Sequence, residues 1–332
     1  MFLKRFFFRT SYSAVVVLGV ALTFALVLLL ESKSLIFNSQ YPTKTETQPF
    51  PVGVYPEIKS IVEQPNVQQY FSENFASNPS SSDNWWNQVA SLFASKVWYQ
   101  NLASPVSRIV VIWPGERKEE IAKNIGDVLH WEKSERDEFQ NLIDASEPVL
   151  SEGKYVPGQY VVHRYVTPSE MSALVYESFK NDVLARYTST VSDQVPLDDT
   201  LIIASLIERE ANNFTNMREV SGVIWNRLFI NMPLQLDATL QYVRGNNSYE
   251  PRWWPAVKPA DKFLTSPFNT YQNSGLPPAP IANPSTEAIL AALNPIKTDC
   301  LYYFHTKSGD YHCSITYEDH VAKLRSLYGR GS

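Results

Sequence analysis

Residues 201–211, LIIASLIEREA, are the stretch that most constrains how this chain can fold. Their apolar side chains crowd almost every side of a 3.6-residue period, a pattern typical of a helix buried inside a domain. Asp198 and Asp199 stand just before this stretch, where helix capping and the helix dipole favour acidic side chains. Because such a helix is stable only when other elements cover it, we predict a domain built around it.

This apolar helix carries two acidic residues near its end, Glu208 and Glu210. Helical spacing places Glu208 on the side of Ala204, Ser205 and Ala211, whose small side chains would leave room beside its carboxylate. Burial disfavours the ionised form of a carboxyl group and raises its pKa, which a general acid needs near neutral pH. The alternative is that the helix turns into solvent and exposes both acids. Periodicity alone leaves both interpretations open.

The N-terminus has the pattern of a membrane anchor. Lys4, Arg5 and Arg9 precede a long uncharged run, and about 20 helical residues span the roughly 30 Å hydrocarbon core of a bilayer. We predict a transmembrane anchor over residues 10–31, with residues 1–9 in the cytoplasm and the rest of the chain outside the cell membrane. A cleaved signal peptide is the alternative, but the run is long for one and a small-residue cleavage site is lacking.

The rest of the chain divides by composition and pattern into three predicted parts. Residues 32–106 are predicted to be a tether, since residues 38–84 are rich in Pro, Ser, Thr, Asn and Gln, with one amphipathic helix over residues 85–102. Residues 107–166 have the strand, helix, helix, strand order of the LysM type of glycan-binding module. Residues 167–328 are predicted to form a mixed α/β domain, in which the Pro-rich segment 246–284 is an ordered loop lining a cleft. The fold class is therefore α+β.

A C-terminal β-hairpin is predicted to turn at Ser308 and Gly309. This turn would place Cys313 opposite Phe304, four residues along the strand from Cys300. Four residues of strand cover about 13 Å, whereas a disulfide needs Cα atoms within about 7 Å. We therefore predict two unpaired cysteines.

Charge and motif content exclude several classes of protein. The 332 residues include 29 basic and 34 acidic side chains, and the net charge of -5 argues against nucleic acid as a partner. The five histidines show no metal-ligand spacing, and no phosphate-binding or dinucleotide-binding motif is present. No cofactor is predicted.

Six segments, in this order and spacing, resemble the YceG-like family of endolytic murein transglycosylases: LIIASLIEREA, VSGVIWNRL, MPLQLDATLQY, SPFNTY, GLPPAPIANPS and AALNPIKTDCLYYF. The resemblance covers residues 108–320 and is strongest over residues 201–304. It implies one N-terminal membrane helix, a LysM-like part and a catalytic domain. It also implies cleavage of the β-1,4 bond after N-acetylmuramic acid within peptidoglycan strands, leaving 1,6-anhydromuramyl ends, so that the enzyme is a lyase.

The resemblance places the catalytic acid on Glu208. This group would protonate the departing glycosidic oxygen and then take the proton of the muramyl C6 hydroxyl as that oxygen attacks C1. A second carboxylate, which glycoside hydrolases require, is dispensable because the substrate supplies the nucleophile. Glu210 is expected to be a structural acid, and Arg227 is expected to pair with an acid inside the fold.

Four further residues lie in the family motifs and are expected to bind substrate. Gln235, Asn269 and Tyr271 offer amide and hydroxyl groups suited to sugars, or alternatively shape the loop that carries them. Asp237 is either a second carboxylate near the cleft or the N-cap of a short helix. The two roles of Asp237 are compatible.

The sequence departs from the family pattern at two places. Gly158 and Gln159 stand where the family commonly has Asp and Thr, which puts the packing of the LysM-like part in doubt, and Ala238 replaces a proline. The expected partners are peptidoglycan glycan strands and, from the family's role in strand termination, a peptidoglycan synthase in the membrane. A non-catalytic wall-binding or division scaffold protein is the alternative function.

Overall fold

The computed structural model describes residues 47–75, 106–211, 213–245 and 252–329. Over these residues the protein is α+β and mostly helical, with three two-stranded sheets. The predicted anchor and the predicted helix over residues 85–102 lie outside the described residues. None of the helices in the described part is long and apolar enough to cross a membrane.

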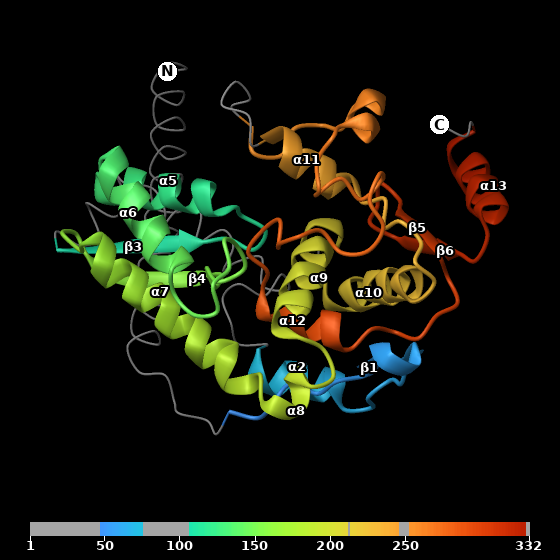
Figure 1. Cartoon of the computed structure of the whole chain (residues 1–332), viewed down its shortest axis with the longest axis horizontal. Coiled ribbons are helices and arrows are strands. Elements are labelled where there is room, and N and C mark those ends of the chain that lie inside the picture. Colours follow the sequence, from blue (N-terminus) through green and yellow to red (C-terminus); the bar gives the residue numbers. More distant parts are fainter. Residues whose placement is uncertain (1–46, 76–105, 212, 246–251, 330–332) are drawn as a thin grey trace, which may run out of the picture.

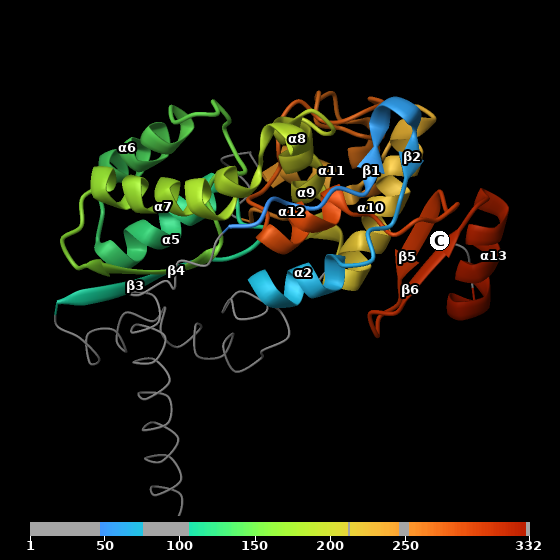
Figure 2. The same ribbon diagram turned by 90° about the horizontal axis from the view of Figure 1, so that it is seen from below.

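The elements lie in three groups along the long axis of the molecule (Figures 1 and 2). A βααβ unit is at one end, a bundle of helices is in the middle, and a β-hairpin with the last helix is at the other end. The short N-terminal elements β1 (Val54–Tyr55), β2 (Ser60–Ile61) and α2 (Val67–Asn74) pack against the middle group.

The βααβ unit follows the order predicted from sequence: β3 (Ser107–Ile112), α5 (Lys118–Leu129), α6 (Lys133–Asp144) and β4 (Gly158–His163). The two strands are antiparallel, with Ser107 opposite His163 and Ile112 opposite Gly158. Apolar faces of both helices and of the sheet enclose a small core that is separate from the main one. Helix α7 (Pro168–Asp182) joins the two cores, because Met171 packs in the small core and Phe179 packs in the large one.

The main core is built on α9 (Leu197–Glu210), which contacts α10 (Phe214–Phe229) and α12 (Thr286–Leu293). Every α9 residue from Thr200 to Ile207 is buried, so the predicted central buried helix is confirmed. The helix begins four residues before the predicted stretch, with Asp198 and Asp199 in its first turn. The remaining helical elements are η1 (Pro56–Ile58), η2 (Leu184–Arg186), α8 (Ser189–Ser192), α11 (Asp237–Gly245) and η3 (Pro259–Phe263).

Helix α10 passes very close to the chain that leads into the hairpin. A Cβ atom on Gly222 would lie 2.3 Å from the backbone oxygen of Ile296 and 3.0 Å from Cγ2 of Thr298. Only glycine permits this approach. The close packing fixes where the hairpin leaves the helical core.

One buried side chain, that of Asn283, connects the βααβ unit to the main core. Its Oδ1 accepts from the backbone nitrogens of Gly153 (2.8 Å) and Tyr155 (3.0 Å). Its Nδ2 donates to the Glu116 carbonyl oxygen (3.1 Å) and to Oε2 of Glu152 (2.7 Å). All the hydrogen-bonding groups of this amide are used, so the contact fixes the position of one part against the other.

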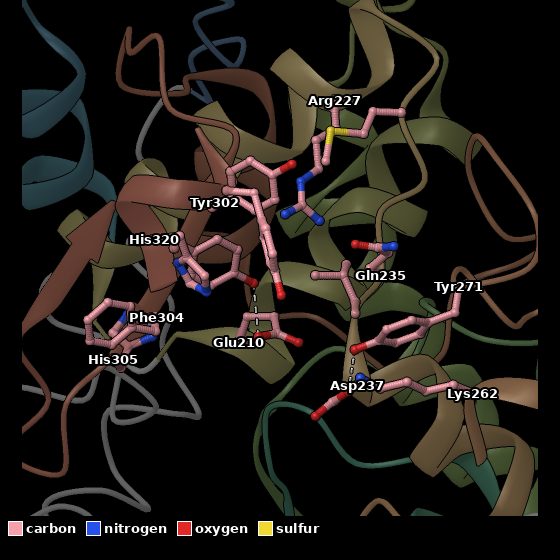
Figure 3. Close-up of a pocket in the computed structure, with 14 residues that line it drawn as sticks. Glu210, Arg227, Gln235, Asp237, Lys262, Tyr271, Tyr302, Phe304, His305 and His320 are labelled. Atoms are coloured by element: carbon pink, nitrogen blue, oxygen red, sulfur yellow. Dashed lines mark hydrogen bonds between the residues drawn. The ribbon is translucent and has the colours of Figure 1, made fainter. Parts of the chain in front are cut away.

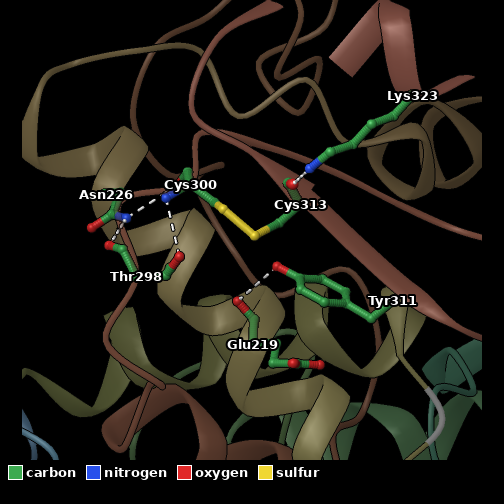
Figure 4. Close-up of a disulfide and its surroundings, with 7 residues drawn as sticks. All are labelled: Glu219, Asn226, Thr298, Cys300, Tyr311, Cys313 and Lys323. Carbon is green, nitrogen blue, oxygen red and sulfur yellow. Dashed lines mark hydrogen bonds between the residues drawn. A yellow bond between two sulfur atoms is a disulfide. The ribbon is translucent and has the colours of Figure 1, made fainter. Parts of the chain in front are cut away.

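The C-terminal hairpin consists of β5 (Tyr302–His305) and β6 (Tyr311–Ser314), followed by α13 (Tyr317–Tyr328). The prediction of two unpaired cysteines is wrong. Cys300 and Cys313 form a disulfide with a Cα–Cα distance of 5.8 Å (Figure 4). Two features bring them together: the register pairs Cys313 with Tyr303, one residue nearer to Cys300 than predicted, and Cys300 lies before the strand, so extended-strand spacing does not apply to it.

Candidate functional site

A pocket of about 740 Å³ opens where α9, α10, α11, the Pro-rich loop, the hairpin and α13 meet. Figure 3 shows Glu210 between two groups of side chains, with Gln235, Asp237, Lys262 and Tyr271 on one side and the hairpin and α13 residues on the other. The lining residues are Glu210, Arg227, Met232, Gln235, Leu236, Asp237, Lys262, Tyr271, Tyr302, Tyr303, Phe304, His305, Tyr317 and His320.

Glu210 is the carboxyl group that α9 presents to the pocket. The hydroxyl of Tyr303 donates to its Oε2 at 2.9 Å, and the backbone N–H of Ala238, in the first turn of α11, favours the ionised form of the carboxyl group. Burial raises the pKa of Glu210 to about 7, although the Tyr303 hydroxyl and the Ala238 N–H favour its ionised form; nearby Asp237 adds to the rise. A carboxyl group with this pKa can both give and take a proton near neutral pH.

Glu208 faces a different part of the molecule. Its Oε2 accepts from the backbone nitrogen (2.9 Å) and the hydroxyl (2.6 Å) of Ser285, the residue that caps the N-terminus of α12. Burial raises the pKa of Glu208, as predicted, and the Ser285 hydrogen bonds oppose this rise. Glu208 does not line the pocket. Its catalytic role stays a prediction, and these contacts favour a structural one.

The small side chains next to Glu208 have a different use from the one expected. The sequence predicts that Ala204, Ser205 and Ala211 leave room beside the Glu208 carboxylate. Instead, the backbone of Ile281 donates to Oγ of Ser205 at 3.0 Å, and Ala204 is completely buried in the core. Ser205 therefore binds the chain that leads to α12, and Ala204 packs in the core.

Three of the four predicted substrate-binding residues line the pocket, namely Gln235, Asp237 and Tyr271. The Tyr271 hydroxyl donates to Oδ1 of Asp237 at 2.7 Å, so this carboxylate faces the pocket from the first residue of α11. Asn269 is fully buried. It donates to the carbonyl oxygens of Lys262 (3.2 Å) and Leu264 (2.8 Å), and so shapes the loop, the alternative role considered for it.

Arg227 was expected to pair with an acid, but its guanidinium group binds carbonyl oxygens instead. Its Nε donates to Leu301 at 2.6 Å and its Nη1 donates to Leu234. These two acceptors lie at the start of the hairpin and just before Gln235. The side chain therefore ties together the two walls of the pocket that it also lines.

Sequence reasoning missed several residues that face the pocket. Lys262 comes from the Pro-rich loop, which lines the pocket as predicted, and Tyr303, His305 and His320 come from the hairpin and α13. The LYYF segment of the last family motif contains Tyr303 and was the one available signal. The described ranges contain no group of three or more His, Cys, Asp or Glu side chains that could hold a metal ion.

The chain resembles known proteins over much of its length. Residues 86–326 match the model of the YceG-like family. The endolytic murein transglycosylase of Bacillus subtilis (strain 168) is 34% identical over 172 residues, which are 51% of this chain and 46% of that protein. The enzyme of the same name from Streptococcus pneumoniae serotype 2 (strain D39) is 29% identical over 170 residues, 51% of this chain and 31% of that one. The chain thus spans less than half the length of these relatives.

A solved structure agrees with the sequence matches. The 2.6 Å crystal structure of a YceG-like protein from Listeria monocytogenes superimposes with a TM-score of 0.57 and 28% identity. The match covers 65% of this chain and 75% of that one. The family match spans well over half of the chain, including every element around the pocket. The chain therefore belongs to the YceG-like family.

Proposed function

We propose that this protein is an endolytic lytic transglycosylase. It cleaves the β-1,4 bond between N-acetylmuramic acid and N-acetylglucosamine within peptidoglycan strands and leaves 1,6-anhydromuramyl ends, which terminates the growth of nascent strands. The observation that carries the proposal is a carboxyl group with a pKa of about 7, Glu210, in a pocket lined by polar side chains. Similarity to two proteins named endolytic murein transglycosylase supports it.

In the proposed reaction the protonated carboxyl group of Glu210 gives its proton to the glycosidic oxygen as the bond from C1 to that oxygen breaks. The muramyl C6 oxygen attacks C1, and its proton passes to the carboxylate, which restores the starting state. No water is consumed, and no second carboxylate is needed as nucleophile. Tyr303 holds the carboxylate through its hydrogen bond, while Gln235, Lys262 and Tyr271 bind the sugar groups on the other side of the pocket.

The geometry favours Glu210 over Glu208 for this role, and substitution distinguishes them. Gln at position 208 keeps an oxygen that accepts both hydrogen bonds from Ser285. Glu208→Gln should therefore lower activity less than tenfold. Glu210→Gln removes the proton donor and should lower it by about 10²- to 10⁴-fold. The opposite ranking of the two variants would assign the acid to Glu208.

The assay uses the full chain in detergent with purified peptidoglycan strands, and mass spectrometry identifies the ends produced. Anhydromuramyl ends that disappear in Glu210→Gln support the proposal. Reducing ends in their place would indicate a hydrolase in which Asp237 activates water. Binding of strands by the wild-type protein without either product would indicate a wall-binding or division scaffold protein.

We also propose that residues 10–31 anchor the protein as a single membrane span, with the N-terminus in the cytoplasm and the pocket on the outer side. The uncharged run and the basic residues before it support this topology. Protease added to intact spheroplasts should remove the pocket domain and leave a short N-terminal fragment in the membrane. Protection of the domain, or its release without protease, would contradict the proposed topology.

A further inference from the structure

Beyond Glu210, one side of the pocket is formed almost entirely by rings. Tyr302 and Phe304 come from β5, and Tyr317 and His320 come from α13; we name these four residues the aromatic wall. Figure 3 shows Tyr302, Phe304 and His320 on the side of Glu210 opposite Tyr271 and Asp237. The general-acid mechanism above uses none of these rings.

The four rings form one connected surface. The Tyr302 centroid lies 5.8 Å from that of Tyr317 and 5.7 Å from that of His320. The Phe304 ring meets His320 at 5.6 Å in an edge-to-face arrangement. Each ring thus positions its neighbour, so the surface that they present to the pocket is preformed.

Core packing does not explain why α13 carries these rings. No residue of α13 is buried, and Tyr317 is 59% exposed. Exposed aromatic side chains that adjoin a pocket mark a binding surface more often than isolated exposed apolar residues do. The wall is therefore available to a ligand that enters the pocket.

We propose that the aromatic wall is a sugar-binding subsite for residues of a β-1,4-linked N-acetylated glycan that lie beyond the bond to be cleaved. A pyranose ring has a face of C–H groups that packs on an aromatic ring, and hydroxyl groups at its edge that bond to polar tips. Tyrosine and histidine offer both an apolar face and a polar tip. Lys262 and Gln235, across the pocket, supply further hydrogen-bond donors.

This inference rests on the proposed function, because it extends the ligand of the same pocket. It adds that the protein prefers long strands to short ones. A site holding only the two sugars at the cleaved bond would treat all lengths alike, whereas a wall beyond Glu210 gives additional affinity only to strands that reach it. Endolytic cleavage, within a strand and not at its end, requires contacts of this kind.

The experiment compares Tyr317→Ala, which removes a ring, with Tyr317→Phe, which removes only a hydroxyl group. Leu327→Ala is the matched control, since Leu327 is 50% exposed on the same helix and does not line the pocket. Binding of uncrosslinked strands of two sugars (one MurNAc–GlcNAc pair) and of twelve sugars to the full-length chain is measured by titration calorimetry. All variants carry Glu210→Gln, so that the strands stay intact.

Tyr317→Ala should weaken binding of the long strand about tenfold and leave the short strand within about twofold. Tyr317→Phe should stay within about threefold of the parent, and Leu327→Ala should not differ from it. In the active background, KM for long strands should rise while kcat changes little. Equal affinity of Tyr317→Ala and Leu327→Ala for the long strand would overturn the proposal. An equal loss of affinity for the long and the short strand in Tyr317→Ala would also overturn it.

The outcomes separate this inference from the proposed function. Absence of anhydromuramyl products, together with ring-dependent binding of long strands, would refute the transglycosylase and retain the subsite. Normal products from Tyr317→Ala with unchanged KM and unchanged affinity would refute the subsite alone. Thermal unfolding of each variant verifies that α13 remains folded.

Discussion

The hydrogen bond from Tyr303 to Glu210 gives a quantitative prediction. Tyr303→Phe removes the hydroxyl group that donates to Oε2 at 2.9 Å and changes no other atom. A hydrogen bond to a charged group contributes about 1.5–3 kcal/mol, and 1.36 kcal/mol corresponds to about one pKa unit. Because this bond favours the ionised carboxylate, its loss should raise the pKa of Glu210 by about one to two units.

The shift has a defined effect on the pH profile. In the proposed mechanism Glu210 must be protonated to act as the acid, so activity should fall on the alkaline side as the carboxyl group ionises. In Tyr303→Phe the alkaline limb of kcat/KM should move up by about one to two pH units. Tyr303 remains a neutral donor over this range, because burial and the adjacent Glu210 raise its pKa well above the ordinary value.

The control is Tyr311→Phe. Tyr311 stacks on Tyr303 at 6.1 Å in the same hairpin, but its hydroxyl reaches the carbonyl oxygen of Glu219 at 3.5 Å and not Glu210. It should leave the alkaline limb in place. An unshifted limb in Tyr303→Phe, or an equal shift in both variants, would show that the hydrogen bond does not set the pKa of the acid.

Three further predictions concern stability. The pKa of Glu210 is raised in the folded state, so the folded protein holds this proton more tightly than the unfolded chain does. The free energy of unfolding of the wild type should therefore fall relative to that of Glu210→Gln as pH rises from about 5 to 8, by up to about 3 kcal/mol. Denaturant titrations at several pH values measure this difference, and a difference that does not change with pH would refute the prediction. Reducing the Cys300–Cys313 bond, which closes a short loop, should lower the free energy of unfolding by about 3 kcal/mol; two free thiols in the denatured, unreduced protein would contradict this. Gly222→Ala should lower the free energy of unfolding by about 1–3 kcal/mol, although alanine has the better helix propensity, because its Cβ would collide with the backbone oxygen of Ile296. An unchanged melting temperature would show that the segment containing Ile296 can move away from α10.

Local patterns predicted the elements well. The crowded apolar run of α9, the strand–helix–helix–strand order before it and the C-terminal hairpin all follow from side-chain periodicity and turn residues. These features depend on residues close in sequence. The disulfide does not follow from strand spacing, because that spacing assumes an extended chain through Cys300, whereas strand pairing begins at Tyr302.

The site was less predictable because its contacts join distant parts of the chain. Tyr303 lies 93 residues after the Glu210 that it bonds, and Asp237 receives its hydrogen bond from Tyr271, 34 residues later. Side-chain type showed that Asn269 and Gln235 could both bind a sugar. Only the folded loop shows that the first is buried in its own turn and the second faces the pocket.

The two acids of α9 show why a motif alone could not assign the roles. Residues two apart on an α-helix point about 200° away from each other, so Glu208 and Glu210 cannot both face one pocket. Glu208 binds Ser285 at the start of α12, and Glu210 meets Tyr303 of the hairpin. The first contact joins α9 to the start of α12, and the second carboxylate lines the pocket. The proposed mechanism therefore assigns the two acids of one helix different roles, and the element that each acid contacts is the reason for that assignment.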